Sequence, residues 1–111
     1  MIYLDSAATS FLKPPGVKAA MMRAMDTMSS PGRGAYNAAM HAADKVYECR
    51  ELACRLFNFD KPEHVVFTLN ATHALNIAIK TLARRESRVV ISGYEHNSVT
   101  RPLHEAGAKV S

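Results

Sequence analysis

The sequence predicts an α/β fold with a parallel sheet, and three neighbouring segments carry that prediction. Residues 64–68 form a short apolar run rich in β-branched and aromatic side chains, which is typical of a buried strand. Residues 71–85 repeat apolar positions at helical spacing, and residues 88–92 are a second β-branched run. A strand, a helix and a strand of these lengths suit a crossover between parallel neighbours.

Length and composition set the class of protein. At 111 residues the chain is one domain at most, with room for a single core. Its content of 48% apolar and 22% charged residues is typical of a soluble protein, and no stretch approaches the roughly 18 apolar residues of a membrane span. The net charge of +4 comes from cations scattered among acids, so we expect neither a nucleic acid nor a membrane as partner.

The cellular compartment and metal binding are also constrained by the sequence. The first residues lack the basic start and long apolar region of a signal peptide. The two cysteines, Cys49 and Cys54, have no zinc-finger spacing and suit a reducing compartment. We therefore expect a cytoplasmic protein without a metal site.

The whole chain, residues 1–111, is predicted to be a single partial domain with three segments. An arm and a helix occupy residues 1–30, and the methionine stripe of that helix is interpreted as core packing. A long helix occupies residues 35–58, and Cys49 on its apolar face is interpreted as a core thiol. A strand, helix and strand segment occupies residues 64–111, whose last five residues resemble the opening of a third strand.

The turn between the first strand and its helix has the features of an anion site. Asn70 is a good N-cap, which leaves the backbone N–H groups of Ala71, Thr72 and His73 at the positive end of the helix dipole. Such a turn binds phosphate readily, and the Thr72 hydroxyl adds a donor. The alternative is that Asn70 only caps the helix.

A second turn follows residues 88–92 and contains His96. Ligands of parallel α/β sheets lie beyond the carboxyl ends of the strands, so both turns are expected to open on the same edge. An imidazole would then lie close to the anion site. His96 could equally be a structural or simply exposed histidine.

Four segments resemble motifs of one enzyme family in the family's order. They are Tyr3-Leu4-Asp5-Ser6-Ala7-Ala8-Thr9, Pro31-Gly32-Arg33-Gly34, residues 67–76 and Glu95-His96-Asn97-Ser98-Val99. At these residues the chain resembles the cysteine desulfurases of aminotransferase class V, which depend on pyridoxal phosphate. The resemblance implies the N-terminal fragment of a fold-type I pyridoxal-phosphate transferase large domain, with a parallel βαβ unit and preceding helices.

The resemblance also implies roles for individual residues. Ala71 and Thr72 would bind the cofactor phosphate, with His73 in the same turn, and His96 would stack on the pyridine ring and relay protons at the substrate carbon. Two departures stand out, because many members have a glycine in place of Asn70 and an acid in place of His73. The residues implied on the substrate side are Ala7, Ala8 and Arg33.

Other parts of the family's machinery have no counterpart in these residues. In the family, the lysine that forms the Schiff base, the acid at the pyridine nitrogen and the sulfur-accepting cysteine all come later in the chain. We therefore expect the 111 residues to be the N-terminal part of a longer enzyme or a truncated product, inactive alone. The implied partners of the full enzyme are cysteine as substrate, a second copy in a homodimer and a sulfur-acceptor protein.

Two alternatives stay open from the sequence. The enzyme could be an aminotransferase instead of a desulfurase. The chain could also be a non-catalytic module that binds a phosphate ligand or packs against a partner.

Overall fold

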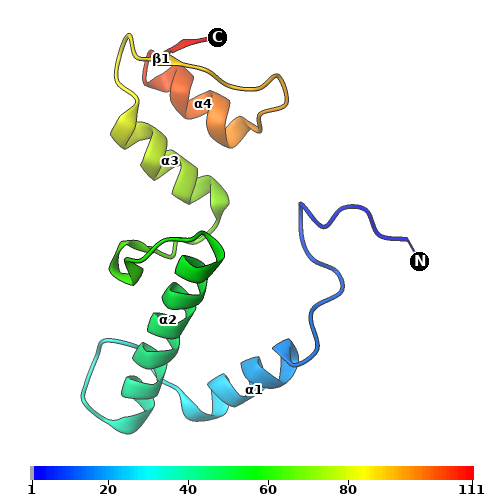
Figure 1. Cartoon of the computed structure of the whole chain (residues 1–111), viewed down its shortest axis with the longest axis vertical. Helices are drawn as coiled ribbons and strands as arrows, with labels where there is room; N and C mark the ends of the chain where they lie inside the picture. The colour runs from blue at the N-terminus through cyan, green and yellow to red at the C-terminus, as the bar shows by residue number, and fades with distance from the viewer. Residues whose placement is uncertain (1) are drawn as a thin grey trace. The chain divides into compact units, whose positions relative to one another are not determined.

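The computed structural model describes residues 2–111, which form two compact units, residues 2–65 and residues 66–111. The predicted helices over residues 17–28, 35–57 and 71–85 are confirmed with slightly shorter bounds (Figure 1). None of the helices in residues 2–111 combines the length and hydropathy of a membrane span. The elements in chain order are α1 (Val17–Thr27), α2 (Asn37–Leu56), the 3-10 turn η1 (Pro62–His64), α3 (Ala71–Leu82), β1 (Arg88–Val89), α4 (Asn97–Glu105) and β2 (Lys109–Val110).

In the first unit, α2 buries a narrow stripe of small side chains. Ala39, Ala42 and Cys54 are its buried residues, whereas Cys49 is exposed. The interpretation of Cys49 as a core thiol is therefore wrong. The chain after α2 turns back, with the Phe59 N–H donating to the Cys54 carbonyl at 2.9 Å, and η1 contacts α2. This return covers the Cys54 side of the helix, which periodicity alone does not reveal.

The methionine stripe of α1 is exposed, contrary to its interpretation as core. Met21 and Met25 are 61% and 71% accessible, and α1 has no buried residue. Helix α1 contacts α2 within the first unit, and none of the elements described there covers the Met21 and Met25 face. The spacing of apolar residues shows which face a helix can bury, but burial requires a second surface.

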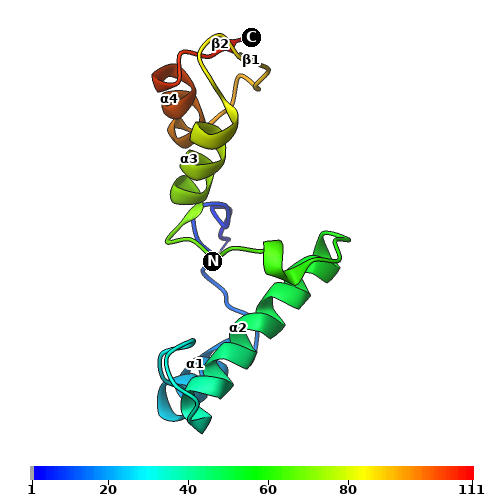
Figure 2. The same ribbon diagram turned by 90° about the vertical axis from the view of Figure 1, so that its left-hand side faces the viewer.

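The second unit is built from two helices and a short parallel ladder. Helices α3 and α4 contact each other and lie side by side in both views (Figures 1 and 2). Strand β1 pairs with β2 in parallel, with Arg88 opposite Lys109. The succession β1, α4, β2 is a βαβ unit, which confirms the predicted fold class and the opening of a strand at the end of the chain. Leu103 and Pro102 of α4 are buried in this unit.

The strand predicted over residues 64–68 is absent from the described chain. His64 ends η1, and the following residues pair with no other segment of residues 2–111. The predicted parallel pairing of residues 88–92 with residues 64–68 is therefore wrong, because β1 pairs with β2. Val66 and Phe67 are 73% and 56% exposed, so the apolar run lacks the ladder that makes an extended segment a strand.

Leu103 is predicted to be a main support of the second unit. It is 2% exposed, so Leu103→Ala should lower the free energy of unfolding by about 2 to 4 kcal/mol. The matched control is Leu69→Ala. This substitution removes the same atoms, but from a side chain that is 89% exposed. Urea unfolding followed by circular dichroism measures both, and equal effects of the two changes would contradict the assignment.

Candidate functional site

Helix α3 begins with the side-chain cap that the sequence predicts. Asn70 has an extended backbone, with φ −168° and ψ 173°, and its Oδ1 accepts the N–H of His73 at 2.8 Å. The Thr68 hydroxyl donates to the Asn70 carbonyl at 2.9 Å, which fixes the chain entering the helix. The start of α3 is therefore held by two local hydrogen bonds.

The Asn70 cap accepts the N–H of His73 and leaves other backbone N–H groups of the first turn of α3 without an acceptor. Within residues 2–111, neither the N–H of Ala71 nor that of Thr72 donates to a protein acceptor, and both residues are exposed. The Thr72 hydroxyl likewise has no acceptor among the described residues. Two backbone N–H groups and a hydroxyl at the positive end of a helix form a donor set that suits a phosphate.

Helix α4 begins with His96 as its cap. The Ser98 N–H donates to His96 Nδ1 at 3.1 Å, and the Ser98 hydroxyl oxygen lies 2.9 Å from the same nitrogen. The turn before it is braced by Glu95, whose Oε1 accepts the Ser92 hydroxyl at 2.9 Å. The imidazole is therefore held against the helix by Nδ1, while the His96 residue as a whole is exposed.

The starts of α3 and α4 lie at the same end of the second unit. The two helices run side by side in the same direction, and both views place their N-terminal ends together (Figures 1 and 2). The two turns therefore lie at one end of the unit, but no strand precedes α3 within residues 2–111, so the shared sheet edge that the sequence predicts is not formed at the first turn. Within residues 2–111, no hydrogen bond joins the two turns directly.

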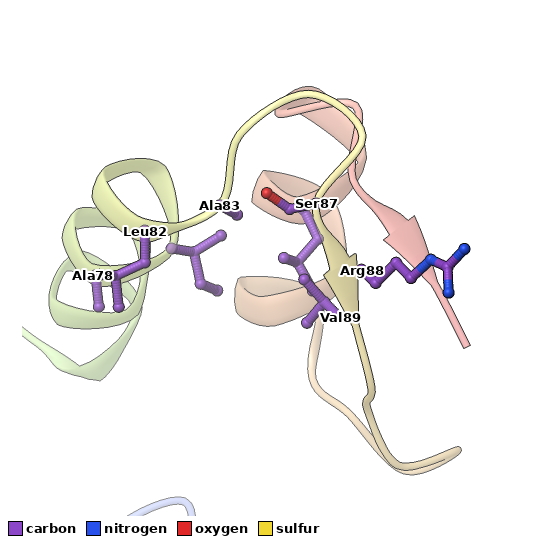
Figure 3. Close-up of a pocket in the computed structure, with 8 residues that line it drawn as sticks. Ala78, Leu82, Ala83, Ser87, Arg88 and Val89 are labelled. Carbon is purple, nitrogen blue, oxygen red and sulfur yellow. The ribbon is translucent and has the colours of Figure 1, made fainter.

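A hollow of about 380 Å³ lies elsewhere in this unit, between α3, β1 and α4 (Figure 3). Its walls are largely apolar and come from the last turns of α3 and the start of β1. It includes none of the predicted site residues, and its chemistry suits packing better than a charged phosphate. The residues that line it are Ala78, Ile79, Leu82, Ala83, Ser87, Arg88, Val89 and Leu103.

Comparison with known proteins assigns the family. A model of the aminotransferase class-V family matches residues 2–111. The chain belongs to this family. The resemblance seen in the four motifs is thereby confirmed.

Relatives of this class-V chain carry desulfurase names. It is 34% identical to a probable cysteine desulfurase of Methanothermobacter thermautotrophicus, over 98% of this chain and 28% of that protein. It is 33% identical to a probable cysteine desulfurase of Aeropyrum pernix, over 92% of this chain and 26% of that protein. The apo structure of a cysteine desulfurase from Thermococcus onnurineus matches with a TM-score of 0.76 at 27% identity, over 99% of this chain and 29% of that one. The class-V chain therefore spans a little over a quarter of the length of these relatives.

The residues that the class-V resemblance places on the substrate side lie in the first unit. Ala7 and Ala8 are in an exposed turn, in which the Ala8 N–H donates to the Asp5 carbonyl at 3.1 Å. Arg33 is exposed in the loop before α2, and no ion pair to it is present among residues 2–111. Gly34 beside it has φ 103°, and a Cβ there would meet the Tyr36 ring at 2.7 Å, so this position requires glycine.

Two residues of the second unit's turns were missed by sequence reasoning. Ser98 is buried and contacts His96, and Glu95 braces the turn through Ser92. The signal for Ser98 was present as a serine two positions after a histidine at the start of a helix. That spacing lets a backbone N–H and a hydroxyl reach one ring nitrogen.

The Asn70 cap is predicted to stabilise α3 measurably. Asn70→Ala should lower the free energy of unfolding by about 1 kcal/mol, because the His73 N–H loses its acceptor. Asn70→Asp keeps an oxygen at this position and should preserve most of the stability. Asn97→Ala is the matched control, since Asn97 lies in the first turn of α4 without a capping role. If thermal unfolding shows equal losses for Asn70→Ala and Asn97→Ala, the cap contributes nothing.

Proposed function

We propose that these residues form the cofactor-phosphate-binding part of a pyridoxal-phosphate-dependent cysteine desulfurase. The observation that carries the proposal is the start of α3, where the N–H groups of Ala71 and Thr72 and the Thr72 hydroxyl have no acceptor within residues 2–111. The desulfurase names of the relatives favour this reaction over transamination.

The donor set fits the charge and shape of a phosphate group. A phosphate accepts several hydrogen bonds at once and is favoured by the positive end of a helix dipole. His73 contributes indirectly, because its N–H holds the Asn70 cap and so fixes the first turn of α3. Asn70 caps the helix and keeps the turn formed, so the departure from the glycine that the family resemblance implies here is compatible with binding.

His96 is proposed to lie against the pyridine ring and to move protons at the substrate α-carbon. When bound, pyridoxal phosphate supplies an electron sink for the charge that develops at that carbon. His96 is the N-cap residue of α4. The starts of α4 and α3 lie at the same end of the unit (Figures 1 and 2). A flat ring at this position can contact the cofactor face, and its free nitrogen can exchange a proton.

We also propose that residues 1–111 alone do not catalyse the reaction. The second unit holds two lysines, Lys80 and Lys109, and both are engaged in ion pairs with Glu105 and Glu86. Lys80 lies in the last turn of α3, at the opposite end from Thr72. Neither lysine is placed to reach a group bound at the start of the helix.

The proposal extends to the surroundings of the reaction. Cysteine is the proposed substrate, with Ala7, Ala8 and Arg33 on its side of the site. A guanidinium such as that of Arg33 can bind a substrate carboxylate through two parallel hydrogen bonds. A homodimer, a sulfur-acceptor protein and a cytoplasmic location complete the proposal.

The Thr72 hydroxyl is predicted to strengthen cofactor binding. Thr72→Val keeps the side-chain shape and removes the hydroxyl, so the dissociation constant for pyridoxal phosphate should rise roughly ten- to a hundredfold, as expected for a hydrogen bond to a charged group. Titration of the native-length protein, followed by cofactor absorbance, measures the change.

The control for this experiment lies on the same helix. Thr81→Val removes a hydroxyl that donates to the Ile77 carbonyl at 2.7 Å, at the far end of α3. This variant should bind the cofactor like the unchanged protein. An unaltered affinity in Thr72→Val would show that the phosphate lies elsewhere.

His96 is predicted to matter more for turnover than for substrate binding. His96→Ala should lower kcat about a hundredfold or more with a smaller change in KM, since a positioned acid or base typically contributes that much. Steady-state sulfide release from cysteine by the native-length protein is the measurement. His104→Ala is the control, because His104 is exposed near the other end of α4. Equal kcat values for the two variants would remove His96 from the chemistry.

A further inference from the structure

His96 is held through one particular nitrogen. The Ser98 backbone N–H donates to Nδ1 at 3.1 Å, and the Ser98 hydroxyl oxygen lies 2.9 Å from Nδ1. A backbone N–H can only donate, so Nδ1 must present its lone pair. In the neutral imidazole the proton then sits on Nε2.

Ser98 has the environment of a side chain with a fixed task. It is only 7% exposed, and it belongs to the first turn of α4. A buried hydroxyl needs a partner, and among residues 2–111 the only one recorded for Ser98 is His96 Nδ1. The backbone and the side chain of one residue therefore converge on the same ring nitrogen.

We propose that Ser98 is a positioning residue that fixes His96 as the Nε2–H tautomer and so makes the neutral ring a hydrogen-bond donor toward the site. With Nδ1 occupied, Nε2 is the nitrogen left for substrate or cofactor. In the neutral state Nε2 carries a proton and donates it in a hydrogen bond, and it has no lone pair with which to remove one. This inference rests on the proposed place of His96 against the pyridine ring, and it narrows the proposed proton transfer: in its neutral form the ring donates a hydrogen bond from Nε2 and does not take the proton from the substrate carbon.

The segment before His96 supports a fixed ring orientation. Glu95 Oε1 accepts the Ser92 hydroxyl at 2.9 Å, and the Tyr94 N–H donates to the Ser92 hydroxyl oxygen at 3.3 Å. These bonds fix the turn on one side of His96, and Ser98 fixes it on the other. The ring is therefore oriented before any ligand arrives, which lowers the entropy cost of using it.

The test reads the tautomer directly. Native-length protein labelled with 15N-histidine is studied by long-range 1H–15N correlation, without cofactor and with it, and His96 is assigned by the loss of its signals in His96→Gln. We expect the 15N chemical shift of Nδ1 to be that of an unprotonated ring nitrogen and the 15N chemical shift of Nε2 to be that of a protonated one. A protonated Nδ1 in the neutral ring would overturn the proposal.

Variants of Ser98 separate positioning from simple folding. Ser98→Ala removes the hydroxyl but keeps the backbone N–H that also donates to Nδ1, so it should weaken the preference for the Nε2–H tautomer without abolishing it. We expect a minor Nδ1–H signal and a kcat lower by roughly three- to tenfold at unchanged KM, the loss expected for one neutral hydrogen bond. Ser98→Thr restores the hydroxyl and should restore both readouts, and Ser111→Ala should change neither. If Ser98→Ala keeps a pure Nε2–H signal, the hydroxyl has no such role.

The outcomes also distinguish this inference from the proposed function. The tautomer of the cofactor-free protein does not depend on what the site binds. A pure Nε2–H signal in a protein that fails to bind pyridoxal phosphate would refute the function and leave the role of Ser98 standing. Cofactor binding with a protonated Nδ1 would do the reverse.

Discussion

The unsatisfied backbone N–H groups at the starts of α3 and α4 are the constraint on which the second unit depends. A helix leaves its first N–H groups without partners, and they must be met by side chains, solvent or a ligand. Asn70 meets one of them at α3 and His96 meets one at α4. The N–H groups of Ala71 and Thr72 are left without a protein acceptor within residues 2–111, and they are the donors that we propose for phosphate binding. The caps therefore stabilise the helices and decide which donors stay available beside them.

Packing places a second constraint on the chain. Its buried apolar side chains among residues 2–111 are few and mostly small, and large ones such as Met25, Phe67 and Leu82 are exposed. Buried apolar area is the main favourable term in folding, so each unit is held by a limited surface. The starts of α3 and α4 are ordered chiefly by local hydrogen bonds, which do not require a large core.

The sequence was sufficient for those features that neighbouring residues determine. Helical periodicity located α1, α2 and α3, and the preference of asparagine for the N-cap located the start of α3.

The sequence was insufficient where segments far apart in the chain determine pairing or burial. Val66 and Phe67 have the composition of a strand, but pairing needs a partner that composition does not name. Cys49 and Cys54 lie on one helix, and only the return of the chain at Phe59 decides which is buried. His96 was identified as a candidate, but its orientation through Ser98 required the structure.

The short ladder between β1 and β2 has a consequence for the order of assembly. Arg88 is paired with Lys109, so the pairing closes a loop of 20 residues (89–108), nine of which form α4. Closing so short a loop costs little chain entropy, and contacts of low sequence separation form quickly. Helices α3 and α4 are likewise near neighbours along the chain. The end of the unit that holds Thr72 and His96 can therefore form early, from contacts made within residues 66–111 alone.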